Sequence, residues 1–344
     1  MKLSQFKFTL PKNLIAQAPR IPRDSCKLML INKDTEEIES MKFKNVINYM
    51  NPGDVLVLND SKVFPARLFG TKEKTKAKIE VFLLRQLSEL ENIWDVVVDP
   101  ARKVRIGNRI FFTKNLYCEV IDNTTSRGRI VRFNVKEDFK KYIEKLGKTP
   151  LPPYIRREST EKDKEYYQTV YAKNTGSVAA PAAGLHFTKE LLKKIENKGV
   201  NIAYVTLHIG LGIFRLVEVE DLSKHRIDSE YYEISKENSD IINYTIHKKK
   251  RVIAVGTSVT RALESSVITG KNVRPSKGWT DRFIHPPHGL SIVSKLITNF
   301  HMPQSTMLML SCSLAERDVI MKAYKKAIKE NYKFYAYGDA LMIV

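Results

Sequence analysis

The chain has 344 residues, of which 58 are lysine or arginine and 38 are aspartate or glutamate, so its formal net charge at pH 7 is +20. Hydrophobic residues make up 43% and charged residues 28%, which is typical of a globular protein and excludes wholesale disorder. Apolar runs too short to span a bilayer argue against a membrane protein, and three scattered cysteines exclude a disulfide framework or a Cys-x-x-Cys metal site.

The first half of the chain predicts one buried strand followed by a β-rich segment. Residues 54–60 form an apolar run that ends in polar residues, as a buried strand does. Further short strands, separated by turn residues, indicate a small β-barrel or sandwich. These strands are expected at residues 78–84, 93–98, 109–112, 117–121 and 129–135. A helix is predicted over residues 138–146, and a stiff, extended proline-rich segment follows at 150–153.

The positive charge is concentrated near this β-rich segment. Residues 101–150 contain 13 lysines and arginines but only 5 acidic residues, whereas residues 51–100 and 201–250 each have a net charge of −1. Such clustering favours a binding face for nucleic acid over a uniform compositional bias. A lysine-rich composition throughout the source proteome is the alternative explanation of the high net charge.

From residue 165 onward, predicted strands alternate with predicted helices. The strands are expected at residues 201–208, 251–255 and 296–300, and the helices at 189–197, 259–267 and 318–330. This alternation is typical of an α/β sheet, to which the strand at 54–60 also belongs. We therefore predict an α/β fold with a mixed-sheet main domain, residues 1–67 and 150–344, and an inserted small β-barrel domain, residues 68–149.

Three histidines lie in loops at the ends of predicted strands or before a predicted helix. They are His186, His208 and His301. Ligands of open α/β sheets bind at the carboxyl ends of the strands, and imidazole suits proton transfer near neutral pH. Each histidine taken alone is more often a packing or capping residue than a catalyst. Their recurrence, together with Asp60 after the first strand, predicts acid–base chemistry at this edge.

Glycine-rich loops follow two of the predicted strands. Gly256, Thr257 and Ser258 join a strand to a helix, so their backbone N–H groups suit a carboxylate or phosphate. An ordinary strand–helix turn with a good N-cap explains the same residues. Gly210 and Gly212 allow a ligand to approach the backbone closely, but the third glycine of a dinucleotide fingerprint is missing.

Taken together, these segments resemble the S-adenosylmethionine:tRNA ribosyltransferase-isomerase family of queuosine biosynthesis. The resemblance covers the whole chain, and its most specific blocks are Ala183-Gly-Leu-His-Phe-Thr188 and Thr298-Asn-Phe-His301. It implies an enzyme that moves the ribosyl part of S-adenosylmethionine onto 7-aminomethyl-7-deazaguanine at the wobble position of a tRNA. The ribose is isomerised to give epoxyqueuosine, and adenine and methionine are released.

The resemblance also implies partners and residue roles. S-adenosylmethionine is a co-substrate, no metal and no membrane are involved, and the enzyme is expected to be a cytoplasmic monomer. The catalytic candidates are His186, His208, His301 and Asp60. The candidates for binding S-adenosylmethionine are Gly210, Gly212, Gly256, Thr257, Ser258, Arg261 and Asp339. The candidates for binding tRNA phosphates are Arg67, Arg102, Arg105 and Arg109.

The chain departs from the common family pattern at several positions. Lys76 stands where many members have glycine, Ala182 where threonine is frequent and Gln304 where lysine is usual. Ser258-Val259-Thr260 replaces a Thr-Ser-Val order before Arg261, and Ser313–Glu316 lacks a usual glycine. A decayed family member or a non-enzymatic tRNA-binding protein is therefore the alternative. Base exchange on tRNA would call for a zinc-binding cysteine cluster, and a methyltransferase for a glycine-rich loop after its first strand. Neither pattern is evident in the sequence.

Overall fold

A nine-stranded mixed sheet forms the centre of the larger part of the molecule. The computed structural model describes residues 1–124, 128–135 and 139–344. The strands of the sheet are β1 (Lys27–Ile31), β2 (Ile38–Lys42), β3 (Val55–Asn59), β12 (Asn201–Leu207), β13 (Glu230–Ile234), β14 (Val252–Val255), β17 (Ser276–Thr280), β18 (Lys295–Asn299) and β19 (Ala340–Ile343). Their order across the sheet is β17-β13-β12-β3-β14-β18-β19-β1-β2.

Four neighbouring strands at the centre of this sheet run parallel. β12 pairs with β3, β3 with β14 and β14 with β18, all in the same direction. These strands are almost continuously apolar because both faces of the sheet are covered. Their carboxyl ends therefore meet at one edge, where polar loops replace the apolar strands.

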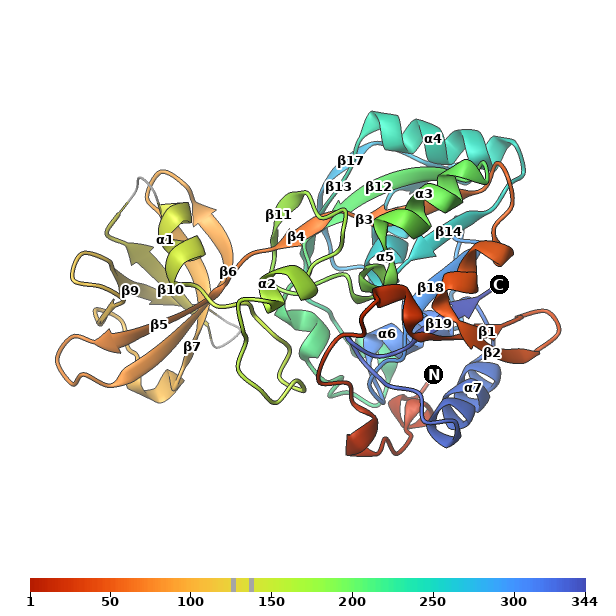
Figure 1. Ribbon diagram of the computed structural model, residues 1–344. Helices are drawn as coiled ribbons and strands as arrows, with labels where there is room; N and C mark the ends of the chain where they lie inside the picture. Colours follow the sequence, from red (N-terminus) through yellow and green to blue (C-terminus); the bar gives the residue numbers. More distant parts are fainter. Residues whose placement is uncertain (125–127, 136–138) are drawn as a thin grey trace.

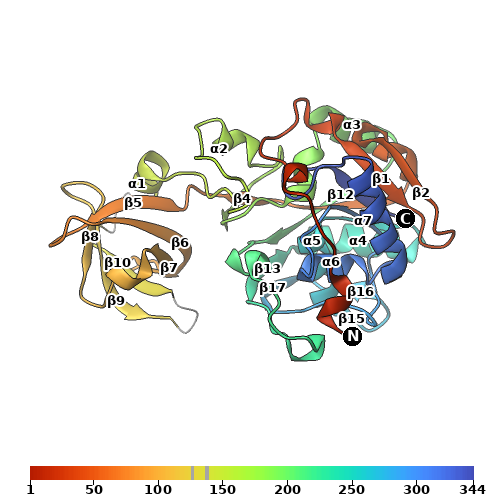
Figure 2. The same cartoon turned by 90° about the horizontal axis from the view of Figure 1, so that it is seen from below.

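Helices cover both faces of the sheet. α3 (Lys189–Asn197) and the short helix η4 (Phe43–Tyr49) pack on one face, where they meet Leu56 and Leu58 of β3. α4 (Lys236–His247), α5 (Thr257–Ser265), α6 (Thr306–Ser311) and α7 (Arg317–Lys329) belong to the other side, where Val55 and Val57 point. Figure 2 shows α3 on one side of the sheet and α5 and α6 on the other. Successive residues of β3 thus face opposite cores, as a strand geometry requires.

A closed antiparallel barrel forms the second part of the molecule. Its strands are β5 (Arg67–Lys72), β6 (Lys78–Ser88), β7 (Ile93–Asp99), β8 (Arg109–Phe111), β9 (Tyr117–Asn123) and β10 (Arg129–Phe133). They close in the order β10-β7-β6-β5-β8-β9. α1 (Phe139–Leu146) adds Phe139 and Ile143 to the barrel core. Figure 1 shows the barrel standing to one side of the sheet domain. The predicted α/β fold with an inserted β-barrel is confirmed.

Two chain segments connect the barrel to the sheet domain, and they pair with each other. The Lys148 amide donates to the Arg67 carbonyl at 2.9 Å, and the Arg67 amide donates back at 3.3 Å. Beside this point, β4 (Ser61–Val63) pairs with β11 (Asn174–Ser177) in a small parallel sheet. The pairing supports domain boundaries after residue 67 and before residue 150, which stay a prediction.

The predicted elements match the observed ones with small shifts at their ends. The helix predicted at 259–267 is α5, which begins two residues earlier, at Thr257, directly after β14. Asp138, at the start of the helix predicted over 138–146, lies outside the described residues. Several elements were not predicted from the sequence: β1, β2, β4, β5, β11, β13, β17, β19, α4, α6, and the short elements α2 (Asp163–Tyr166), β15 (Val267–Ile268) and β16 (Asn272–Val273). Within the described ranges, no helix is long and apolar enough to cross a membrane.

Candidate active site

A pocket opens at the carboxyl edge of the parallel strands. Its walls come from η6 (Ala182–His186), η7 (Leu211–Phe214), the first turn of α5 and the loop that follows β18. Its empty volume is about 1120 Å³ including the open mouth. The lining is largely apolar, with a few polar groups on α5 and beside β18, as in most small-molecule sites. We call this space the sheet-edge pocket.

One wall of the sheet-edge pocket holds a buried ion pair between Arg261 of α5 and Glu230 of β13. Glu230 is only 5% exposed, and desolvation raises the pKa of its carboxyl although Arg261 opposes the shift. The other carboxylate oxygen of Glu230 accepts a hydrogen bond from the Gly210 amide at 2.8 Å. Arg261 also donates to the Thr280 carbonyl at 3.1 Å. A single buried carboxylate therefore fixes both the guanidinium and the glycine loop after β12.

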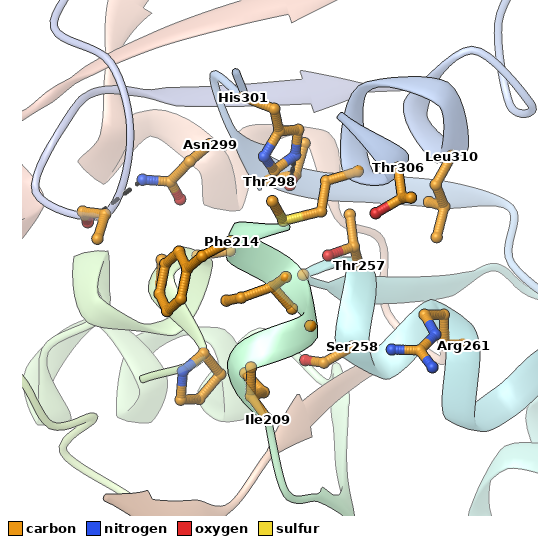
Figure 3. Close-up of a pocket in the computed structure, with 18 of the residues that line it drawn as sticks. Ile209, Phe214, Thr257, Ser258, Arg261, Thr298, Asn299, His301, Thr306 and Leu310 are labelled. Atoms are coloured by element: carbon orange, nitrogen blue, oxygen red, sulfur yellow. Dashed lines mark hydrogen bonds between the residues drawn. The ribbon is translucent and has the colours of Figure 1, made fainter. Parts of the chain in front are cut away.

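The first turn of α5 contributes the polar end of the pocket. Gly256 has a φ of +96°, a left-handed conformation that favours glycine, and it turns the chain from β14 into the helix. Thr257 and Ser258 follow, and the Ser258 hydroxyl accepts a hydrogen bond from the Asn59 side chain at 3.1 Å. Figure 3 shows Thr257, Ser258 and Arg261 reaching the pocket from this one helix. The arrangement provides unpaired helix N–H groups and a cation for an anionic group.

His301 lies in the pocket wall opposite α5 (Figure 3). Its Nε2 atom is 2.9 Å from the hydroxyl of Thr298, and its backbone amide donates to the Tyr324 hydroxyl at 3.0 Å. Burial lowers the pKa of His301 to about 3, so the ring is neutral near pH 7. A neutral imidazole with so low a pKa is a weak base but an effective hydrogen-bond partner for a bound ligand.

His208 lies on the other side of the loop after β12, in a second hollow between the barrel and strands β13 and β17. We call this hollow the interdomain cleft; the residues lining it include His208, Tyr231, Trp279, Gly176, Arg85, Trp94 and Lys140. The Nδ1 atom of His208 is 2.7 Å from the Ser61 hydroxyl, and burial lowers the pKa of the ring to about 4. Since the next residue, Ile209, lines the sheet-edge pocket, one short loop separates the two spaces.

Comparison with known proteins gives the relationship of the whole chain. The family model described as "Queuosine biosynthesis protein" matches residues 3–343. The chain belongs to this family. It is 54% identical over 348 residues to the S-adenosylmethionine:tRNA ribosyltransferase-isomerase of Cytophaga hutchinsonii, with all of both chains covered. It is 52% identical, over the full length of both chains, to the protein of the same name from a Sulfurihydrogenibium species.

A solved structure of the family supports the fold. The crystal structure of S-adenosylmethionine tRNA ribosyltransferase from Thermotoga maritima is similar, with a TM-score of 0.57 and 34% sequence identity. The match covers 99% of this chain and all of the other. The family resemblance that the sequence predicted is therefore confirmed at full length.

His186 and Asp339, both predicted for the family's active site, are buried outside the sheet-edge pocket. His186 lies behind its wall, where Nε2–H donates to Asn299 Oδ1 at 3.2 Å and Nδ1 is 3.2 Å from the Cys26 sulfur. Asp339 is fully buried and accepts hydrogen bonds from the Lys27 and Lys333 amides, both at 2.7 Å. His186 is thus placed to orient Asn299, and Asp339 to hold two backbone segments.

The remaining predicted residues are spread over both domains. The Asp60 carboxylate accepts hydrogen bonds from the Thr206 hydroxyl at 2.6 Å and from the side-chain amide of Asn174 at 3.0 Å. Asp60 lines neither of the two hollows. Arg67 is half-buried at the base of the barrel and pairs with Glu80, and Arg109 pairs with Glu119 at 3.3 Å. Arg102, Arg105 and Arg109 are exposed on the barrel. Gly212 lines the sheet-edge pocket next to Asp228, whereas the Gly210 amide donates a hydrogen bond to Glu230.

The departures from the family pattern mostly fall away from the sheet-edge pocket. Lys76 and Gln304 have φ values of +55° and +58°. Both therefore adopt the left-handed backbone conformation, which glycine adopts most readily. Ser313–Glu316 lines a separate surface hollow with Lys33 and Arg317. Of the residues at which the chain departs from the pattern, Ala182 and Ser258 line the pocket, and Ser258 retains a hydroxyl. At Ala182 the pocket lacks the hydroxyl that a threonine would supply, whereas the polar groups of α5 and His301 described above are present.

Several pocket residues were not predicted from the sequence. They are Tyr154, Phe214, Asp228, Glu230 and Tyr335. The burial of Glu230 could have been predicted from the sequence. The alternation in Glu230-Tyr-Tyr-Glu-Ile places it on the same strand face as Tyr232 and Ile234, both of which are buried. A lone carboxylate on an apolar strand face indicates a buried charge with a partner. Among the described residues, no group of His, Cys, Asp and Glu could hold a metal ion.

Because burial lowers the pKa of three histidines, we expect the protein to lose stability in mild acid. Burial lowers the pKa of His186 from 6.5 to about 4, so below about pH 6.5 the unfolded chain binds a proton that the folded chain does not. The free energy of unfolding should therefore fall between about pH 6.5 and pH 4, on the order of 3 kcal/mol from His186 alone. His208 and His301 act in the same direction.

Urea unfolding followed by circular dichroism at several pH values measures this effect. The His186→Gln variant should show a flatter pH dependence than the native chain, whereas His247→Gln, at the exposed end of α4, should not change it. Equal slopes for the native chain and His186→Gln would contradict the assignment.

Proposed function

We propose that this protein transfers and isomerises the ribosyl part of S-adenosylmethionine onto a 7-aminomethyl-7-deazaguanine in tRNA, and releases adenine and methionine. The observation that carries the proposal is full-length identity of 50–54% to proteins named for this activity. The structure supports the proposal with two hollows that one loop separates: the sheet-edge pocket, of a size for a small molecule, and the larger interdomain cleft. We expect the enzyme to work as a cytoplasmic monomer that needs no metal.

The sheet-edge pocket suits S-adenosylmethionine in both charge and shape. Tyr154 lies 4.6 Å from Tyr335 and 6.1 Å from Phe214 between ring centroids, so three aromatic rings gather at one wall. Aromatic faces and the carboxylate of Asp228 attract a cationic sulfonium. The start of α5, with Arg261 beside it, suits the carboxylate of the methionine part.

The interdomain cleft suits the tRNA. It lies between the sheet domain and the basic barrel, and Arg85 and Lys140 of the barrel domain line it. Because His208 and Ile209 face different hollows, a nucleotide in the cleft and a sulfonium in the pocket would approach each other at the loop after β12. The exposed arginines Arg102, Arg105 and Arg109 extend the positive surface along the barrel.

The reaction needs proton transfers, and His208 and His301 suit different roles in them. The sulfonium acidifies the neighbouring C5′–H, so a modest base can remove this proton before the aminomethyl group forms its new bond. His208 fits this role because tRNA phosphates in the cleft would raise its pKa from the low value of the free protein. His301 fits a neutral hydrogen-bonding role toward the leaving adenine or the sugar.

Release of adenine tests the proposal directly. Protein, S-adenosylmethionine and tRNA carrying 7-aminomethyl-7-deazaguanine are mixed, and free adenine is measured by chromatography. We expect one adenine for each nucleotide modified, and none with tRNA that carries guanine at the same position. A tRNA-binding protein without activity would bind the tRNA and release no adenine, and that result would overturn the proposal.

A further inference from the structure

The interdomain cleft contains three aromatic rings that touch one another. His208 and Tyr231 lie nearly parallel, with ring centroids 5.5 Å apart and an angle of 21° between the planes. Tyr231 of β13 is paired directly opposite Trp279 of β17, and their centroids are 5.9 Å apart at 75°. The rings thus continue from the loop at the sheet-edge pocket out to the edge strand β17. Figure 1 shows β17 beside β13.

Core packing does not account for these rings. On β13, Tyr232 and Ile234 point into the main core, so Tyr231 points to the opposite face. The indole of Trp279 is 54% exposed. The Tyr231 hydroxyl donates to Glu233 at 2.7 Å, which fixes this ring while its face remains beside His208. A large exposed aromatic surface within a cleft is typical of a ligand contact.

The charges around the rings favour nucleic acid as the ligand. The guanidinium of Arg85 lies 5.2 Å from the Trp279 ring centroid, so a cation of the barrel already faces the indole. Lys140 also lines the cleft, as do the carboxylates Glu89 and Glu144. Aromatic rings interleaved with cations bind single-stranded nucleotides, because bases stack on the rings and phosphates pair with the cations.

We propose that His208, Tyr231 and Trp279 form a stacking platform for unpaired bases of the tRNA anticodon loop that flank the modified nucleotide. The proposal rests on the proposed function and deepens it by assigning the surface that holds the substrate. The platform begins at His208, beside the reacting centre, and ends at Trp279, so a splayed-out neighbouring base would stack on the exposed indole. Stacking accepts any base, so the platform positions the loop without reading its sequence.

Truncation of the exposed ring tests the platform. Trp279→Ala should weaken binding of a 7-aminomethyl-7-deazaguanine anticodon stem-loop by roughly 5- to 150-fold, the range measured for single base–aromatic stacks. Trp279→Phe, which keeps an aromatic face, should recover most of the affinity. Tyr244→Ala, at an exposed tyrosine on α4, is the matched control and should bind as the native chain does. The affinity for S-adenosylmethionine should be the same in all four proteins.

Intrinsic fluorescence provides a second readout. The chain has two tryptophans, of which Trp94 is buried in the barrel and Trp279 is exposed. Trp94 also lines the cleft but is present in both proteins, so the difference in emission between the native chain and Trp279→Phe reports on the Trp279 indole. The stem-loop should quench this emission. Native binding affinity in Trp279→Ala, with adenine still released by the native enzyme, would overturn the platform alone. Absence of both tRNA binding and adenine release in the native chain would overturn the proposed function and the platform together.

Discussion

Replacing His208 by alanine is expected to lower the single-turnover rate of adenine release by roughly 10²- to 10⁴-fold, the usual contribution of a general acid or base. The ring lies at the boundary of the interdomain cleft and the sheet-edge pocket, and Ser61 holds its Nδ1 atom at 2.7 Å. Because the ring faces the interdomain cleft and does not line the sheet-edge pocket, the affinity for S-adenosylmethionine should change little. Rapid-quench measurement at saturating tRNA separates the chemical step from tRNA binding.

The pH dependence of the native enzyme provides the companion measurement. The pKa of His208 is about 4 in the free protein and should rise when tRNA phosphates approach, so the rate should increase with pH across the titration of this ring. His208→Ala should lose that inflection, whereas His247→Ala, exposed on α4, should retain both rate and inflection. A near-native rate in His208→Ala would remove this residue from the mechanism.

Replacing Arg261 by alanine is expected to lower the free energy of unfolding by about 3–5 kcal/mol, because it leaves the carboxylate of Glu230 buried without its partner. The uncompensated carboxyl should have a further raised pKa and take up a proton on folding. Its destabilising effect should therefore grow as the pH rises above the pKa of an unfolded glutamate, and shrink toward pH 5. Urea unfolding of the variant at pH 5 and pH 7.5 measures both effects.

Two variants serve as controls for this ion pair. The double variant Glu230→Gln/Arg261→Ala should regain much of the lost stability but not the affinity for S-adenosylmethionine, since the cation at α5 is still missing. Arg215→Ala breaks a second ion pair of the same site, with Asp228 at 3.0 Å, but both partners are about half exposed. It should cost less than about 1 kcal/mol. An equally small loss in Arg261→Ala would contradict the assignment of a buried, mutually dependent pair.

The sequence predicted the parallel core because its strands are strongly patterned. The run at Val55–Leu58 and the run at Val252–Val255 are fully buried, and only a strand covered on both faces is so uniformly apolar. The barrel strands were found for a different reason, since turn residues separate them at short intervals. α4 was missed because its few apolar residues are diluted by polar ones, and packing against the sheet stabilises it.

The candidate site was predicted less completely than the fold. All three histidines lie at or near the expected edge, but a one-dimensional pattern does not determine which way a ring turns in a loop. His186 turns toward Cys26, His208 toward Ser61 and His301 toward Thr298, and these partners come from different parts of the chain or from a loop geometry set by packing. Residues that enter the site from the barrel side, such as Arg85, depend on how the two domains meet, which no local pattern contains.

The two hollows on either side of one loop would allow this chain to join a ribosyl unit of S-adenosylmethionine to a base in tRNA. Mass spectrometry of the nucleosides tests it most directly. The protein is incubated with S-adenosylmethionine and tRNA that carries 7-aminomethyl-7-deazaguanine, and the digested tRNA is analysed. We expect the substrate nucleoside to disappear and epoxyqueuosine to appear in equal amount. An unchanged substrate nucleoside, with tRNA and S-adenosylmethionine both bound, would contradict it.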